Sequence, residues 1–161
     1  DPKPGKPGRV NSFYSEGAVG ASVRVNLNTG VVKVDQIVGV FDVGKAINPK
    51  LVNEQIVGAI SMGLAGVLYE GMVYDKKTGR TINANYSDYK IPTIHEHPVV
   101  VPIFLEEGHP QGPYGAKGIG ESPTVAVIPA VANAIRDATG YRFKELPITP
   151  EDIYLKISKT E

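Results

Sequence analysis

The chain has no cysteine among its 161 residues. Disulfide bonds, thiolate zinc sites, iron–sulfur ligation by this chain and a cysteine nucleophile are therefore excluded. A surplus of one charge sign is also lacking, because 17 Lys and Arg residues balance 17 Asp and Glu residues. No net field favours nucleic acid or an anionic membrane, so we expect neither as a partner.

Long apolar runs are lacking as well. None approaches the roughly 18 residues that a membrane-spanning helix needs. The opening residues "DPKPGKPGR" have no apolar core of the kind that a secretory signal peptide carries. Nothing in the sequence argues for export, and we expect a cytoplasmic protein.

Common catalytic motifs are absent too. The sequence has no GxSxG, HExxH or P-loop motif, and "GAKGIGE" does not fit a dinucleotide-binding GxGxxG. His95 and His97 would share one face of an extended segment, and His109 is the only other histidine. Two interpretations stay open, a metal site formed by these three side chains or histidines exposed in an irregular loop.

Glycine (18 residues) and proline (13 residues) are abundant. This composition favours many turns and short elements. Residues 1–11 are typical of a linker, and residues 12–161 have the length of one domain. Alternating apolar and polar residues on both sides of "NTG" at 28–30 predict a β-hairpin within residues 19–44.

A long amphipathic helix is predicted over about residues 49–69. Asn48 suits the N-cap and Pro49 the first helical position, and apolar residues recur at i+4 spacing. Each glycine inside the helix weakens it by up to ~1 kcal/mol relative to alanine, which indicates a close neighbour. Because so short a chain offers little to fill that role, we expect an exposed apolar patch and oligomers. The glycines are Gly58, Gly63 and Gly66.

The remaining elements are shorter. The segment 72–82 predicts strand, turn and strand, and 99–107 predicts an edge or bulged strand because Pro102 cannot donate to a ladder. Since Pro129 would break a helix, we expect a turn first and then a helix over about 129–139. A short C-terminal helix follows. The order of elements predicts an α+β fold, a two-layer sandwich with a mixed β-sheet and helices on one face.

The segment "GAKGIGES", residues 115–122, is the candidate functional element. Its glycines allow a bound group to approach the backbone and its N–H donors closely. Glu121, held just before a Ser-Pro pair, has the chemistry of a general base. The residues alone leave a second interpretation open, in which this loop is a connector and Glu121 caps the helix that follows.

Four motifs occur in order along the chain. They are "FDVGKAINPKLVNEQIVGAISMGLAGVLYEG", "YSDYKIPT", "GAKGIGESP" with its Ala-rich helix, and "LPITPEDIY". Together they resemble the molybdenum hydroxylases, the family of xanthine dehydrogenase, aldehyde oxidoreductase and the aerobic carbon monoxide dehydrogenase large chain. The resemblance covers about residues 12–157 and matches the C-terminal molybdopterin-binding portion of that family.

The resemblance implies a role for each matched residue. Glu121 falls on the family's glutamate beside molybdenum, the general base in a hydroxylation whose oxygen comes from water. A buried carboxylate suits that proton transfer. Lys117, Gly118, Ile119 and Gly120 fall on the backbone run along the molybdopterin. The metal's sulfur ligands come from the pterin, so we expect no metal ligand in this chain.

Two departures accompany the resemblance. Met62 stands where the family often has a glutamine that hydrogen-bonds the pterin, and a thioether is only a weak acceptor for the same role. The upstream part of a full molybdenum subunit is missing. We therefore expect a split subunit or an excised domain that neither holds cofactor nor turns over alone.

The implied function is part of an oxidoreductase that hydroxylates a C–H carbon of an aldehyde, a purine or another heteroaromatic compound. Expected partners are the rest of the molybdenum subunit and the iron–sulfur and flavin subunits or domains, which would carry the clusters and FAD. The alternative is a non-catalytic structural or interaction module on the same fold.

Overall fold

A three-stranded sheet forms one layer of the computed structural model, which describes residues 14–159. β1 (Gly17–Val25) and β2 (Val32–Asp42) pair antiparallel, and β3 (Val99–Leu105) pairs parallel to β2, in the order β1-β2-β3. The predicted hairpin and the predicted edge strand are therefore confirmed. The predicted linker, residues 1–11, lies outside the described residues.

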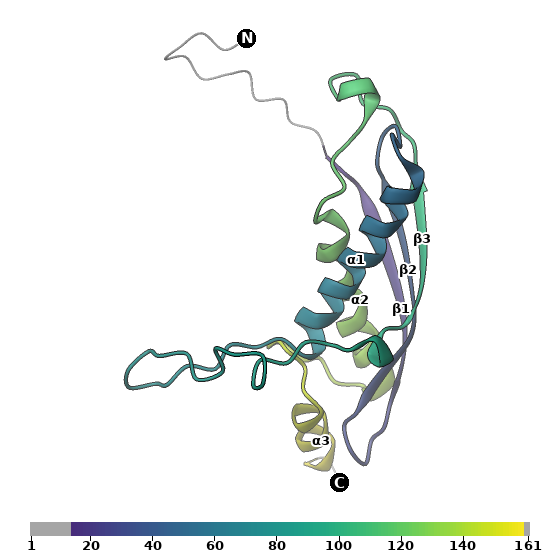
Figure 1. Ribbon diagram of the computed structural model, residues 1–161. Helices are drawn as coiled ribbons and strands as arrows, with labels where there is room; N and C mark the ends of the chain where they lie inside the picture. Colours follow the sequence, from purple (N-terminus) through teal and green to yellow (C-terminus); the bar gives the residue numbers. More distant parts are fainter. Residues whose placement is uncertain (1–13, 160–161) are drawn as a thin grey trace.

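Helices cover one face of this sheet (Figure 1). α1 (Pro49–Leu68) and α2 (Ser122–Thr139) pack against it side by side, and α3 (Pro150–Ser158) lies near the hairpin turn. The core between the layers is apolar and fully enclosed. Its largest fully buried side chains come from β2, α1, α2, α3 and the segment before α3: Ile37, Phe41, Ile56, Ile60, Leu64, Ile135, Ile148 and Ile153. The predicted α+β two-layer sandwich is confirmed.

The first helix follows the sequence prediction closely. Asn48 is its N-cap and accepts a hydrogen bond from the backbone N–H of Leu51 at 3.2 Å, and Pro49 is the first helical residue. An 18-residue window of α1 has a mean hydropathy of 1.4, enough by length and composition to cross a membrane. This corrects the expectation that no run approaches such a span. Half of that window is nevertheless buried inside the domain, as in the core helix of a soluble protein.

α2 corrects the prediction of a turn followed by a helix at 129–139, because the helix begins at Ser122 and continues through Pro129. The buried positions Pro123, Val127, Val131 and Ile135 keep a spacing of four residues across that proline. Pro129 itself is exposed, so the carbonyl that loses its intrahelical partner faces solvent. Continuous packing on the buried face outweighs the local cost of the proline.

The glycines of α1 have different surroundings. A Cβ on Gly63 would lie 2.7 Å from Val127 Cβ and 3.0 Å from the Thr124 carbonyl, so α2 fills the notch at this position. A Cβ on Gly58 would meet nothing within 4 Å. The close neighbour predicted from these glycines therefore exists at Gly63, but it belongs to the same chain, contrary to the expectation.

An arm, residues 70–92, projects sideways from the layered body at the C-terminal end of α1 (Figure 1). The predicted strand–turn–strand over 72–82 is reduced to one isolated antiparallel bridge, between Tyr74 and Thr81, with a turn between them. In that turn the Asp75 carboxylate accepts from the N–H groups of Lys77 and Thr78 and from the Thr78 hydroxyl. A 3-10 turn, η1 (Ile94–Glu96), connects the arm to β3, and a second, η2 (Pro113–Gly115), follows β3.

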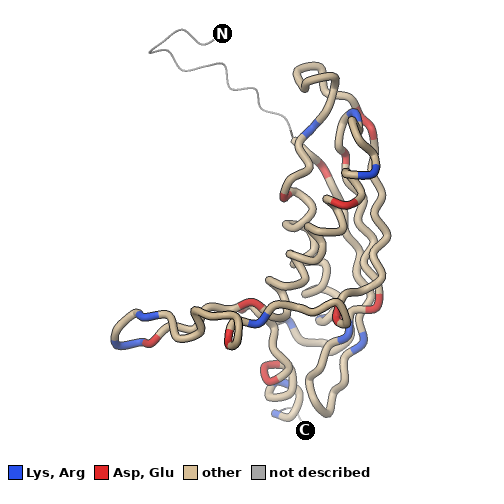
Figure 2. Tube along the Cα trace, in the orientation of Figure 1, with Lys and Arg blue, Asp and Glu red and all other residues tan. Residues whose placement is uncertain are grey.

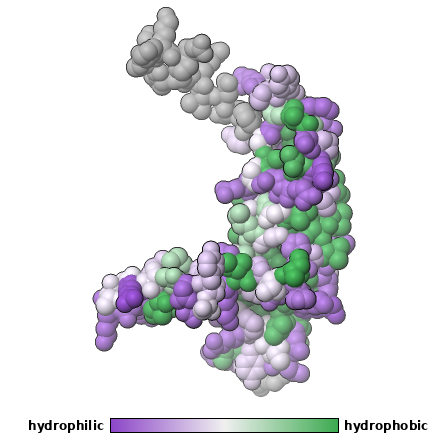
Figure 3. All heavy atoms as spheres, in the orientation of Figure 1, coloured by the Kyte–Doolittle hydropathy of each residue, from purple (hydrophilic) through white to green (hydrophobic). Residues whose placement is uncertain are grey.

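The face of the sheet opposite the helices exposes an apolar strip on β3. Val99, Ile103 and Leu105 are 63%, 42% and 51% exposed, while the alternate residues Val100 and Phe104 pack against the core. Figure 3 shows hydrophobic residues along the side of the molecule that carries β3. An exposed apolar surface was expected, although on the glycine face of α1. The expected oligomer stays a prediction.

Candidate functional site

The glycine run, residues 117–121, begins beside the end of β2. The backbone N–H of Lys117 donates to the carbonyl of Val43 at 2.9 Å, and that of Lys45 donates to the carbonyl of Gly115 at 2.9 Å. These bonds surround an isolated antiparallel bridge between Gly44 and Ala116. Gly44 has a φ of +59°, and a Cβ there would lie 2.2 Å from the Gly115 carbonyl. Only glycine permits this close crossing of the two segments.

The side chain of Lys117 forms an ion pair with Asp42, the last residue of β2. The two side chains are only 11% and 10% exposed. The same carboxylate accepts hydrogen bonds from the N–H groups of Gly44 at 2.9 Å and Glu107 at 3.3 Å. Burial alone would raise the pKa of Asp42, but the Lys117 ammonium and the two amides outweigh it and lower that pKa.

The far end of the glycine run is held by α1. Gln55 Nε2 donates to the carbonyl of Gly120 at 2.5 Å. Between the two anchors, the Ile119 side chain packs inward against the core cluster. Of the four residues predicted to line a cofactor, Lys117 and Ile119 thus direct their side chains into the domain. The implied contact of their backbone with the cofactor stays a prediction.

Asp42 and Gln55 were not identified from the sequence. Both lie inside the first family-like motif, but nothing local distinguishes an acid at the end of a strand or a glutamine on a helix. Their partners are 75 and 65 residues away along the chain. Only the folded arrangement shows that they hold the glycine run.

Glu121 occupies the N-cap position of α2 but its side chain makes no capping hydrogen bond. The interpretation of Glu121 as a simple cap is therefore wrong. Its side chain is exposed, whereas a buried carboxylate was expected. The next residue, Ser122, has a buried hydroxyl with no hydrogen-bond partner among the described residues. A free carboxylate and an unsatisfied hydroxyl thus lie together where the glycine run enters α2.

Met62 lies close to the same helix start. Its side chain is on α1 and is 54% exposed. The Thr124 hydroxyl donates to the carbonyl of Ala59 at 3.2 Å and contacts Met62 Sδ at 3.8 Å. The structure therefore brings Met62 to the first turn of α2, one turn from Glu121.

Backbone groups of the glycine run are open to solvent. A Cβ placed on Gly118 or Gly120 would meet nothing within 4 Å, and both residues are exposed. Within residues 14–159, no acceptor is found for the N–H groups from Gly118 to Glu121. A groove of about 350 Å³ lies beside them, lined by residues 116, 117, 119 and 120, by the start of α1 and by Gln55. The run thus offers unpaired donors to a group bound at its surface.

A larger hollow of about 790 Å³ lies at the other end of α1, at the base of the arm. It is lined mainly by tyrosines, valines and the η1 turn with His95 and His97, and by no residue of the glycine run and not by Met62. We place the candidate site at the smaller groove, because it is lined by the glycine run, which leads directly into Glu121. Size alone does not indicate chemistry.

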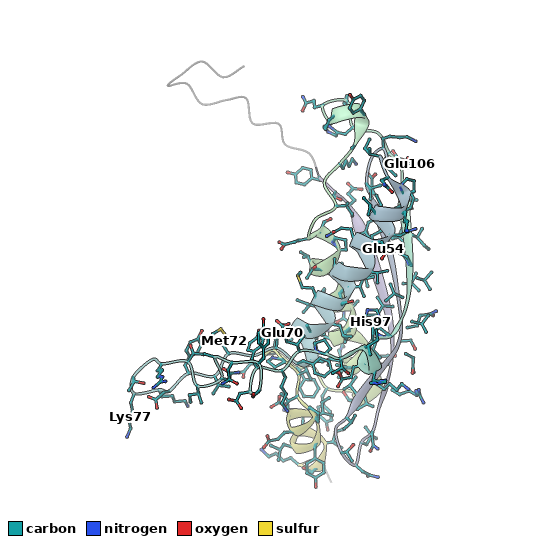
Figure 4. All side chains as sticks on the ribbon, viewed as in Figure 1. Glu54, Glu70, Met72, Lys77, His97 and Glu106 are labelled. Carbon is teal, nitrogen blue, oxygen red and sulfur yellow. The ribbon has the colours of Figure 1, made fainter. Side chains whose placement is uncertain are left out.

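The histidines do not converge. His95 is exposed on η1, whereas His97 is half-buried, with Nε2 2.6 Å from Ser61 Oγ and Nδ1 3.0 Å from the Pro98 carbonyl (Figure 4). His109 lies in the loop beyond β3. Over the described range, no group of three or more His, Cys, Asp or Glu side chains could hold a metal ion. His97 is therefore not an exposed loop histidine but contacts α1.

Comparison with known proteins adds evidence independent of this geometry. A family model described as "Molybdopterin cofactor-binding domain" matches residues 2–98. The chain is 39% identical over 123 residues to the xanthine dehydrogenase molybdenum-binding subunit of Escherichia coli O157:H7, covering 76% of the chain. It is 35% identical over 136 residues to the aldehyde oxidoreductase molybdenum-binding subunit of Escherichia coli K12, covering 84% of the chain.

A solved structure shares the fold. Quinoline 2-oxidoreductase from Pseudomonas putida 86 superposes with a TM-score of 0.80 at 34% identity, over 85% of this chain and 18% of that one. The chain spans only 16% and 19% of the lengths of the two Escherichia coli relatives. The similarity therefore concerns one portion of much longer proteins.

Proposed function

The chain belongs to the molybdopterin cofactor-binding domain family of the molybdenum hydroxylases, and from this premise we propose that its glycine run is the face that binds the cofactor. In this proposal the backbone of residues 117–120 lies along the molybdopterin, with Met62 beside it. Glu121 is the general base of a C–H hydroxylation. The observation that carries the proposal is the free Glu121 carboxylate at the end of an open glycine backbone.

The residues present fit such a cofactor. Molybdopterin is polar and carries an anionic phosphate, and the N–H groups from Gly118 to Glu121 have no acceptor in the described part of the chain. The buried Ser122 hydroxyl likewise lacks a partner, which an additional polar group would satisfy. The glycines leave the space that a side chain would otherwise fill.

When bound, the cofactor supplies the redox centre that accepts electrons from the substrate carbon. The chain's own contribution is a proton acceptor. Glu121 is exposed and forms no capping bond, so its carboxylate is available to take a proton from the attacking oxygen. Burial by the cofactor and by neighbouring parts of the enzyme would complete the water-excluded site.

The test is Glu121→Gln in the assembled enzyme that contains this chain. The amide keeps the size of the side chain but cannot accept a proton, so kcat should fall by about 10²–10⁴-fold. Molybdenum and pterin contents should stay unchanged. The matched control is Glu145→Gln, at an exposed glutamate beyond the opposite end of α2, which should leave kcat unchanged. Full activity of Glu121→Gln would rule out the base role.

The second candidate is a non-catalytic module on the same fold. Met62 favours it, since an exposed thioether offers little to a pterin. In that case the glycine run packs against a partner. Cofactor content distinguishes the two functions, because a non-catalytic module yields an assembled protein whose molybdenum content is independent of residues 118–120.

From the same family membership we propose the partners of this chain. The chain is part of an oxidoreductase acting on an aldehyde, a purine or another heteroaromatic compound, and is inactive alone because its glycine run forms only one wall of a site. The remaining molybdenum portion and the iron–sulfur and flavin subunits complete it. Metal analysis and turnover after co-expression with the neighbouring chains test this assembly.

A further inference from the structure

We propose that the buried Asp42–Lys117 ion pair is a positioning element for the glycine run. It fixes where the run begins beside the end of β2, and therefore where Glu121 lies. The inference rests on the proposed function in one respect, that Glu121 is the reacting side chain. Neither Asp42 nor the ammonium of Lys117 is assigned a contact with substrate. They act through the backbone that connects Lys117 to Glu121.

Asp42 is itself held in place independently of Lys117. Its carboxylate accepts N–H groups from Gly44 and Glu107, on two different backbone segments. Its backbone N–H donates to Glu16 at 2.8 Å, and its carbonyl accepts from Ser15 Oγ at 2.9 Å. The carboxylate is thus a fixed acceptor at the end of β2, to which the Lys117 ammonium binds.

The glycine run has few other means of holding its path. Gly118 and Gly120 lack side chains, and their surroundings are open. Ile119 packs against the core, but apolar contact is non-directional and tolerates sliding. Beyond the ion pair, the directional restraints are the Lys117 N–H bond to Val43 and the Gln55 bond to Gly120. The Lys117 N–H bond and the ion pair together hold one end of the run, the first through the main chain and the second through the side chain.

A second ion pair in the same molecule provides a control. Arg24 and Asp35 form two side-chain hydrogen bonds, at 2.8 and 2.6 Å, across the β1–β2 hairpin. Their side chains are 69% and 32% exposed. The pair has the same charges as Asp42–Lys117 but is far from the glycine run in the fold. Asp35→Glu therefore makes the same chemical change, one added methylene on a paired carboxylate, away from the glycine run.

The decisive variant is Asp42→Glu in the assembled enzyme, with Asp35→Glu as its control. Glutamate keeps the charge and the ion pair but moves the carboxylate by one methylene. A misplacement of that order lowers kcat by about a hundredfold when a reacting group is shifted, and KM should stay within about twofold because substrate binding is untouched. Asp35→Glu should change neither. Wild-type kcat in a folded, cofactor-loaded Asp42→Glu enzyme would overturn the proposal.

Hydrogen exchange gives a readout that does not depend on turnover. In Asp42→Asn, which keeps the size of the side chain and the oxygen that accepts from the two backbone amides but removes the charge, exchange of the Lys117 and Lys45 amides, which donate to Val43 and Gly115, should accelerate by about tenfold. Exchange in β1 and in the arm should stay at the wild-type rate. Uniform acceleration across the chain would indicate a purely structural role and contradict positioning. Should Asp42→Asn fail to fold, Asp42→Glu still decides.

The two proposals fail in different ways. If Glu121→Gln is fully active, the proposed function is wrong whatever the Asp42 variants do. If Glu121→Gln is inactive while Asp42→Glu has wild-type kcat and exchange, only the positioning role is wrong. Loss of kcat in both, with cofactor content retained, supports both.

Discussion

An irregular segment lies at each end of α1, the glycine run at the N-terminal end and the arm at the C-terminal end, and the two are held in place differently. At the N-terminal end, the glycine run is held by contacts between residues 65 to 75 positions apart: Gln55 with Gly120 and Asp42 with Lys117. At the C-terminal end, the hydrogen bonds that the structure describes for the arm span 19 residues or fewer, such as Tyr89 Oη donating to Glu70 at 3.0 Å. Figure 4 shows Glu70 at the base of the arm, beside the end of α1, with Met72 farther out and Lys77 at the tip.

This difference separates two kinds of surface. The glycine run takes its position from the core, so damage to the core is expected to disturb it. The arm carries its own turns, and its tip presents lysines to solvent (Figure 2). Its shape depends little on the body. A change in one region should therefore leave the other intact, which the following substitutions test.

The largest effect is expected for Lys117→Met. The substitution leaves the Asp42 carboxylate buried without its cation, which should lower the free energy of unfolding by about 3–5 kcal/mol. Urea unfolding of the purified protein measures it. Limited proteolysis of the arm should stay unchanged in the folded fraction. A loss below about 1 kcal/mol, typical of exposed pairs, would show that the pair is not effectively buried.

Gly63→Ala should act next, through the contact between α1 and α2. The added methyl would lie 2.7 Å from Val127 Cβ, and such overpacking lowers the free energy of unfolding by about 1–3 kcal/mol. Gly58→Ala, at an open helical position, should instead stabilise by up to ~1 kcal/mol. If both substitutions change the free energy of unfolding in the same direction, the packing of α2 against α1 is looser than described.

Asn83→Ala is the matching change at the arm. Asn83 is only 8% exposed, accepts from the N–H of Val73 at 2.9 Å and donates to the carbonyl of Gly71 at 2.7 Å. Losing both bonds should cost about 1–3 kcal/mol locally and accelerate proteolysis within the arm. Hydrogen exchange of the glycine run should not change. Acceleration at both places would disprove the independence of the two ends.

The smallest effect on the free energy of unfolding is expected from acid, because protonation of Asp42 removes a charge without changing any side chain. The pKa of Asp42 is lowered in the folded protein, so its stabilisation is complete above the unfolded pKa of about 3.9. It is lost as pH falls through the lower folded value. The difference in unfolding free energy between wild type and Asp42→Asn should therefore shrink as pH falls. A difference independent of pH would contradict this assignment.

The contrast between the two ends also explains what the sequence could predict. The α1 cap at Asn48, the hairpin turn and the apolar spacing of α1 are local patterns, and the structure confirms them. The prediction of a turn before Pro129 was wrong, because packing on the buried face of α2 outweighs the local cost of the proline. The strand pair expected at 72–82 is limited to one bridge for a related reason, because the local turn around Asp75 competes with a ladder.

Site prediction divides along the same line. Motif order identified the glycine run and Glu121, whose roles stay predictions. The supports of that run, Asp42 and Gln55, depend on contacts across the fold, and no spacing rule connects positions that far apart. The inward direction of Ile119 likewise follows from the core rather than from its glycine-rich neighbours.

Pro102, in the middle of β3 opposite Gly39 of β2, has a consequence for solubility. A proline is tolerated in an edge strand where its missing N–H would face the free edge. An approaching strand would find no donor at that point, so β3 is a poor template for the edge-to-edge growth that leads to aggregates. Whatever covers the strip of Val99, Ile103 and Leu105 must therefore bind through side chains rather than extend the sheet.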